Sequence, residues 1–174
     1  MTNNDILRRL RYAFDFSDTK MIAIFRLAEK QVTRAEISNW LKKEEDTDFK
    51  KFHDVEMATF LNGFIISRRG KKEGDQPKPE KRLSNNIVFK KLKIALNLKS
   101  NEILEILESA DFVMSEHELS SFFRKPTNSH YRECKDQILR NFLKGVQIKY
   151  RKPSNESDQA AEEPKAVKPS VWDK

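Results

Sequence analysis

The 174-residue sequence contains a single cysteine, four glycines and no long apolar run. One cysteine cannot form an internal disulfide, which excludes the class of small disulfide-stabilised secreted domains. No apolar stretch approaches the ~18 residues that a membrane-spanning helix requires, and the N-terminus lacks the basic start and apolar stretch of a signal peptide. We therefore expect a cytoplasmic protein that does not cross a membrane.

The sequence also lacks the short motifs that mark common catalytic and nucleotide-binding sites. It contains no P-loop, no glycine-rich dinucleotide turn and no Gly-x-Ser-x-Gly. His130 and Cys134 lie four residues apart and could share a helix face, but a zinc site usually needs four ligands. We therefore expect no metal, no cofactor and no enzymatic activity.

The most informative feature that is present is an internal repeat. Shifting residues 3–69 by 82 positions, without a gap, places them on residues 85–151, with about fifteen identities and a nearly intact hydrophobic pattern. A repeat of this length indicates duplication of a folding unit. The expected domains are a helical repeat at 1–70, a linker at 71–84, a second repeat at 85–151 and a flexible tail at 152–174.

Each repeat shows the apolar spacing of helices rather than the alternation of strands. Helical faces are expected over residues 6–14, 21–28, 37–41 and 57–64, and again over 88–96, 103–110, 119–123 and 139–146. The sequence therefore predicts an all-α protein made of two tandem four-helix repeats with pseudo-symmetry.

Several helix starts can be predicted from capping residues. Thr33 with Glu36, and Ser115 with Glu118, form capping boxes at equivalent positions, so the third helix of each repeat should begin there. Ser17 or Asp18 and Ser100 are expected to cap the second helices, and the asparagine pairs at 3–4 and 85–86 the first.

Matched positions in the two copies are candidates for structural or binding roles. Gly63 and Gly145 match inside the fourth helix, where glycine costs about 1 kcal/mol relative to alanine, so a close helix approach or a ligand contact is expected there. Asp54 matches Asp136, and either they cap or pair within their own unit or they mark a duplicated binding site. Cys134 aligns with Phe52, which favours a buried apolar role for the thiol.

Basic residues suggest a partner, because lysine and arginine clusters can neutralise phosphates. They lie on the first helix of each repeat and at the end of the fourth, where they also complement the helix dipole. The candidate contacts to nucleic acid are Arg8, Arg9, Arg11, Lys90, Lys91, Lys93, Arg69 and Arg151.

Two other functions stay open at this level. One is a protein-interaction adaptor whose groove lies between the repeats, and the other is an enzyme that uses Asp54 with Asp136, or His130 with Cys134. A helix-turn-helix that reads DNA with residues 33–43 is disfavoured, because the corresponding second-repeat helix begins with acidic residues that would face phosphate. The leading hypothesis is association with RNA or DNA, and the oligomeric state is not predicted.

Four segments together resemble a known family: Asn3 to Arg8, Phe60 to Gly63, Asn85 to Leu92, and Arg132 to Gly145. Their order and spacing are similar to those of the YehS-like family of small bacterial proteins, a duplicated domain of unknown function. The resemblance covers residues 1–151 and implies a bacterial, cytosolic, duplicated helical protein. It brings no established activity and therefore no catalytic residue.

Overall fold

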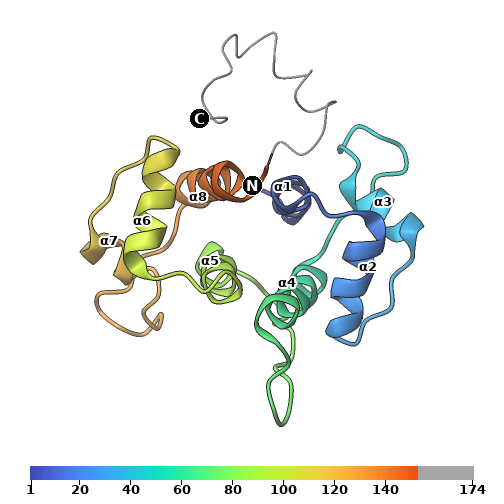
Figure 1. Ribbon diagram of the computed structural model, residues 1–174, viewed down its shortest axis with the longest axis horizontal. Helices are drawn as coiled ribbons and strands as arrows, with labels where there is room; N and C mark the ends of the chain where they lie inside the picture. Colours follow the sequence, from blue (N-terminus) through green and yellow to red (C-terminus); the bar gives the residue numbers. More distant parts are fainter. Residues whose placement is uncertain (153–174) are drawn as a thin grey trace, which may run out of the picture.

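A computed structural model describes residues 1–152 of the chain and shows eight α-helices there. In chain order they are α1 (Asn3–Phe14), α2 (Asp18–Leu27), α3 (Arg34–Leu41), α4 (Asp54–Arg69), α5 (Asn85–Ala95), α6 (Ser100–Ser109), α7 (Glu116–Ser121) and α8 (Asp136–Tyr150). Four helices fall in each copy of the sequence repeat, which confirms the all-α fold with tandem repeats (Figure 1). The expected flexible tail lies outside the described residues, apart from Lys152.

Hydroxyl side chains begin most of these helices. Thr2, Ser17, Thr33, Ser84 and Ser115 each accept a hydrogen bond from the backbone N–H three residues later. The capping boxes at Thr33 and Ser115 are therefore confirmed. Because Thr2 and Ser84 cap α1 and α5, the prediction that the asparagine pairs do so is wrong. The N-cap of α6 is Lys99 rather than Ser100.

Helices α1, α4, α5 and α8 form a central bundle in which they run parallel. Asp54 contacts Leu83 before α5, and Asn62 contacts Lys91 within α5, and each pair is 29 residues apart. A constant separation means that α4 and α5 run in the same direction and in register. Helices α1 and α8 are joined by Met1 with Asp136 where both begin and by Arg151 with Tyr12 where both end, so they too run in the same direction.

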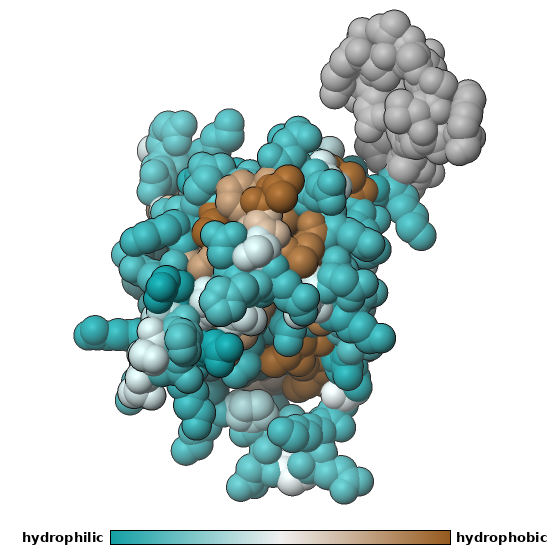
Figure 2. Space-filling model, turned by 90° about the vertical axis from the view of Figure 1, so that its left-hand side faces the viewer, coloured by the Kyte–Doolittle hydropathy of each residue, from teal (hydrophilic) through white to brown (hydrophobic). Residues whose placement is uncertain are grey.

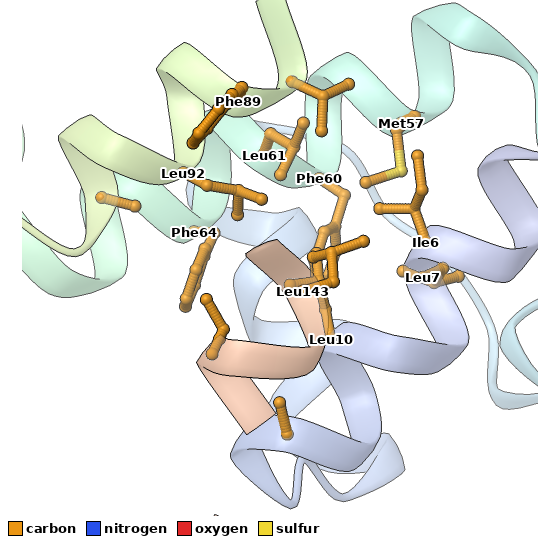
Figure 3. Packing of buried hydrophobic residues seen from close by; sticks show 14 of the residues in the cluster. Ile6, Leu7, Leu10, Met57, Phe60, Leu61, Phe64, Phe89, Leu92 and Leu143 are labelled. Atoms are coloured by element: carbon orange, nitrogen blue, oxygen red, sulfur yellow. The ribbon is translucent and has the colours of Figure 1, made fainter. Parts of the chain in front are cut away.

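The repeats share one hydrophobic core inside this bundle. Leu10 and Phe60 of the first repeat pack beside Leu92 and Leu143 of the second (Figure 3). Helices α2 and α3 pack outside α1 and α4, and α6 and α7 take the corresponding positions in the second repeat (Figure 1). The space between the repeats is therefore filled with side chains.

Close helix contacts explain the matched glycines. A Cβ added at Gly63 would lie 2.0 Å from the carbonyl oxygen of Ile24 on α2, and one at Gly145 would lie 2.1 Å from that of Ile106 on α6. Only glycine allows α4 and α8 to approach the backbones of these outer helices.

Among residues 1–152, no helix has the length and apolar character needed to cross a membrane.

Candidate functional site

The N-terminal end of the central bundle is held by buried asparagine side chains. Asn4 donates from Nδ2 to the carbonyl oxygens of Trp40 and Lys50, at 2.8 and 2.9 Å, and accepts from the N–H of Phe52 at 3.0 Å. Asn86 makes the same three contacts in the second repeat, with Phe122, Arg132 and Cys134. Each asparagine thus ties the segment before the fourth helix to the first helix.

The matched aspartates connect one repeat to the start of the other. Asp54 accepts from Asn3 of its own repeat at 2.7 Å and from the backbone N–H of Leu83, which precedes α5, at 2.9 Å. Asp136 accepts from Asn85 at 2.8 Å and from the amino group of Met1, also at 2.8 Å. Met1 and Leu83 are equivalent positions, so both aspartates bridge the repeats instead of pairing only within their own unit.

The charge of Asp136 makes this bridge sensitive to acid. Hydrogen bonds from the amino group of Met1 and then from Asn85 lower the pKa of Asp136 below its ordinary value of 3.8. A lowered folded-state pKa stabilises the fold above the unfolded value, and the stabilisation is lost as pH falls through the folded value. We expect Asp136→Asn to lower the urea midpoint at about pH 6, by a difference from the parent chain that shrinks as pH falls through the folded pKa of Asp136.

The matched control for this prediction is Asp48→Asn, which removes the same charge from an exposed loop. Its urea midpoint should follow the parent chain across the titration. A midpoint difference for Asp136→Asn that stayed constant from neutral pH to acid would contradict the linkage.

The opposite end of the bundle, which we call the basic end, collects positive charge from both repeats. All four central helices finish there and each has lysine or arginine in its last turn, or just beyond it: Arg11, Arg68, Arg69, Lys93, Lys149 and Arg151. The N-terminal end has the opposite character, because Asp5, Asp54, Glu56 and Asp136 lie in first turns. The molecule is therefore polarised along the bundle.

Aromatic rings lie among the cations of the basic end. The guanidinium of Arg68 lies 5.7 Å from the ring centroid of Tyr150 and 5.6 Å from that of Phe14. Arg151 stacks on Tyr12 at 3.8 Å, donates to its carbonyl oxygen and lies 3.8 Å from Asp15. The side chain of Tyr12 is half exposed. Arg68 and Tyr150 occupy equivalent repeat positions, so this pair joins the repeats at the pseudo-twofold axis.

The structure separates the predicted nucleic-acid contacts into two groups. Arg11, Lys93, Arg69 and Arg151 lie at the basic end, and Lys90 is exposed on α5. Lys91 is buried, with Nζ 2.6 Å from Oδ1 of Asn62 and 3.1 Å from Oε1 of Glu80. It cannot serve as a phosphate contact, which corrects that prediction.

Arg8 and Arg9 lie in the middle of α1 rather than at the basic end. Arg8 is engaged within its repeat, where it pairs with Asp5 and donates to the carbonyl oxygen of Lys42 at 2.7 Å. Arg9 is half-buried and lines a shallow hollow between α1 and α8.

His130 and Cys134, which were considered for catalysis, do not lie together on a helix. His130 is exposed, and residues 131–135 are not helical, so it does not share a helix face with Cys134. Cys134 is buried, and burial together with the carboxylates of Asp136 and Glu133 raises the pKa of its thiol to about 12. Within the described residues, His, Cys, Asp and Glu form no group of three that could hold a metal ion.

Two hollows adjoin these features. One of about 420 Å³ lies between the N-terminal ends of α1 and α5 and is lined by Asn3, Asp54 and Asn85, whereas Asp136 lies outside its lining. The other, of about 270 Å³, lies under the linker beside α4 and is lined by Asn62, Ile65, Pro77 and Pro79 among others. The aspartates therefore do not face each other across a common pocket.

Exposed apolar residues are spread over the surface of the molecule. The side that carries α6 and α7 is mostly hydrophilic, with apolar residues visible in separate areas (Figure 2). The large exposed hydrophobic residues are spread over several elements: Tyr12, Leu27, Val55, Ile94, Val113 and Ile148.

Comparison with known proteins follows the same division into two repeats. The sequence pattern of a family described as a protein of unknown function (DUF1456) matches residues 3–70 and again residues 85–152. The chain belongs to this family. A curated relative is the "Uncharacterized protein YehS" of Escherichia coli (strain K12), which is 41% identical over 147 residues, covering 84% of this chain and 94% of the relative. No solved structure matches the chain.

The family match confirms the resemblance to YehS-like proteins but supplies no residue roles. Sequence reasoning missed Asn62 and Tyr150, which differ from their repeat counterparts Lys144 and Arg68. Arg68 contacts Tyr150 across the interface between the repeats, although the two residues occupy the same position in their repeats. Unlike residues at a matched position can therefore indicate a contact between the copies. This signal indicates Tyr150, whereas Asn62 contacts Lys91 and carries no such signal.

Proposed function

We propose that this protein is a non-enzymatic module that binds single-stranded nucleic acid at its basic end. The observation that carries the proposal is the parallel central bundle, which brings the basic last turns of both repeats to one end. In an antiparallel four-helix bundle, these cations would be divided between the two ends.

The charges at this end suit a phosphate backbone. Arg11, Arg69 and Lys149 are exposed, and Lys93 is partly exposed. Carboxylates in the first turns at the opposite end increase the asymmetry, which would orient the molecule toward a polyanion. The same lysines and arginines offset the negative ends of four aligned helix dipoles, so mutants must be tested for binding and for stability separately.

Exposed aromatic surface favours single strands over duplexes. Tyr12 is half exposed beside Arg151, and Tyr150 lies beside Arg68 at the same end. Unpaired bases stack on aromatic and guanidinium planes, whereas a duplex keeps its bases stacked on each other. Cations next to an accessible ring can contact the backbone and a base at once.

Supporting observations also favour a binding role over catalysis. The carboxylates of Asp54 and Asp136 accept structural hydrogen bonds, and the raised pKa of Cys134 leaves its thiol protonated near neutral pH. These groups are occupied in holding the fold together.

The proposal can be tested by fluorescence anisotropy with labelled single-stranded RNA and DNA of equal length at two salt concentrations. The variant Arg11→Glu, Arg69→Glu, Lys93→Glu, Lys149→Glu should bind much more weakly. Its log–log salt slope should fall in magnitude by roughly 3, because about 0.7 is expected for each lost contact to a single strand.

A control variant should change net charge equally at other exposed sites: Lys43→Glu, Lys50→Glu, Lys125→Glu and Lys135→Glu. It should retain most of the affinity, and circular dichroism should confirm that both variants are folded. No binding by the parent chain at low salt would overturn the proposal, as would equal losses in the two variants.

A further inference from the structure

Pseudo-symmetry gives the bundle two equivalent helix pairs that differ in what covers them. Helix α4 packs on α5, and α8 packs on α1. The linker leaves the end of α4 as a loop that projects from the bundle (Figure 1) and returns to the start of α5, with Pro77 and Pro79 beside α4 and Glu80 beside α5. On the α1 and α8 pair, the described part of the chain supplies no corresponding segment.

The covered pair shows how the linker is held. Glu80 forms an ion pair with the buried Lys91 of α5, whose Nζ also donates to Asn62 of α4. Pro77 and Pro79 line the adjoining cavity together with apolar side chains of α2 and α4. The carboxylate of Glu80 therefore lies at the groove between α4 and α5, and the prolines that precede it lie against α2 and α4.

The uncovered pair carries more positive charge at the equivalent positions. Arg9 and Lys144 stand at the positions of Lys91 and Asn62, so the groove has two cations where the other has one. Within residues 1–152, neither side chain forms a hydrogen bond or ion pair. A hollow of about 280 Å³ lies beside Arg9, Tyr12 and Gln147.

Apolar surface is also open along this groove. Ile148 on α8 is 53% exposed, although its counterpart Ile66 on α4 lines the linker cavity and is only partly exposed. Tyr12 is 50% exposed on α1. The second groove therefore has the features of the first without its occupant.

We propose that residues 153–174 of the same chain bind in the groove between α1 and α8, with Glu162 and Glu163 paired to Arg9 and Lys144. The chain leaves α8 at Lys152 as the linker leaves α4 at Gly70, because these positions are equivalent in the repeat. The 82-residue shift then places Glu162 at the position of Glu80.

The sequence beyond Lys152 matches the linker in order and complements the groove in charge. Asp158-Gln159 corresponds to Asp75-Gln76 when one extra residue is allowed, which places Glu163 on Glu80. Residues 153–163 contain four carboxylates and no basic residue, whereas linker residues 71–81 contain three carboxylates and four lysines. The extra cation of the groove is thus matched by a more acidic segment.

The test is paramagnetic relaxation enhancement in the full-length chain with a nitroxide attached at Ser157→Cys. The buried, high-pKa Cys134 should not take the label. We expect enhanced relaxation of the backbone amides of Tyr12 and Gln147. Their repeat counterparts in the covered groove, Ile94 and Ile65, are internal controls that should be unaffected.

Charge variants of the labelled chain then test the ion pairs. Glu162→Lys with Glu163→Lys should reduce the enhancement to the level that attachment of the tail at Lys152 alone produces, whereas Lys165→Glu with Lys168→Glu should leave the parent level unchanged. Adding Arg9→Glu and Lys144→Glu to the first variant should restore it. Absence of enhancement in the parent would overturn the proposal, and so would insensitivity to these charges.

A mixed sample distinguishes binding within one chain from binding between chains. Isotope-labelled protein without nitroxide is combined with unlabelled protein carrying the nitroxide. Binding within the chain predicts no enhancement in this sample. Enhancement there would assign the groove to a second copy and contradict the proposal.

Discussion

Replacing Gly63 with alanine is expected to lower the free energy of unfolding by about 3 kcal/mol, at the upper end of the cost of overpacking a core. The added Cβ would lie 2.0 Å from a backbone oxygen of Ile24, and α2 cannot yield without moving as a whole. Alanine has a helix-propensity advantage of about 1 kcal/mol over glycine, which is smaller than this cost. Urea unfolding followed by circular dichroism would measure the change.

Gly70→Ala is the informative control for this substitution. Gly70 has a φ of +89°, and a Cβ added there would meet no neighbouring side chain or backbone atom within 4 Å, so it tests backbone strain without a clash. We expect a loss of about 1–3 kcal/mol there, because a ψ of 163° at this φ places Gly70 in a backbone region that is essentially restricted to glycine. If Gly63→Ala were as stable as the parent, the close approach of α2 and α4 would not be the reason for glycine at this position.

The repeat itself predicted the fold, because two copies with the same apolar spacing must build the same unit. The helices and the buried role of Cys134 followed from periodicity and from its match to Phe52. The direction in which one unit packs on the other did not follow. Parallel packing in register depends on contacts such as Asp54 with Leu83, which join positions that periodicity treats as unrelated.

The sequence pattern places Lys91 on the surface because it does not show how the two repeats pack against each other. On an isolated α5, a lysine between apolar residues falls on the polar face, and its counterpart Arg9 supports that interpretation. Only the neighbouring α4 and the linker place Asn62 and Glu80 around its ammonium group. Arg69 and Arg151 were identified correctly as neighbours of the helix ends, but their convergence at one end required the orientation of the bundle.

The asparagine pairs were misinterpreted for a different physical reason. A short polar side chain just before an apolar run has the pattern of an N-cap, and Asn is a favoured cap. In the structure the hydroxyl of Thr2 occupies that role, which leaves Asn3 and Asn4 inside α1. Their partners lie 36 to 51 residues away in sequence, a range that no local rule covers.

Asn4→Ala is therefore expected to be the other strongly destabilising substitution. It leaves the carbonyl oxygens of Trp40 and Lys50 and the N–H of Phe52 without their partner in a largely buried setting. An unsatisfied buried polar group costs about 1–3 kcal/mol, so a loss of roughly 3–5 kcal/mol is expected, since some of the three groups will gain water. Urea unfolding would give the magnitude, and amide hydrogen exchange at Phe52 should lose its protection.

Asn4→Asp separates hydrogen bonding from packing, because aspartate has nearly the same shape. Its carboxylate keeps one oxygen as the acceptor for Phe52 but places the other, in the position of Nδ2, against the carbonyl oxygens of Trp40 and Lys50. If the amide donor is the essential group, Asn4→Asp should be at least as destabilising as Asn4→Ala, whereas a packing role would leave it close to the parent. The exposed Asn101→Ala should change stability by no more than about 0.5 kcal/mol. Asn86→Ala should repeat the loss in the second repeat, because the same donor there holds the segment that leads into α8.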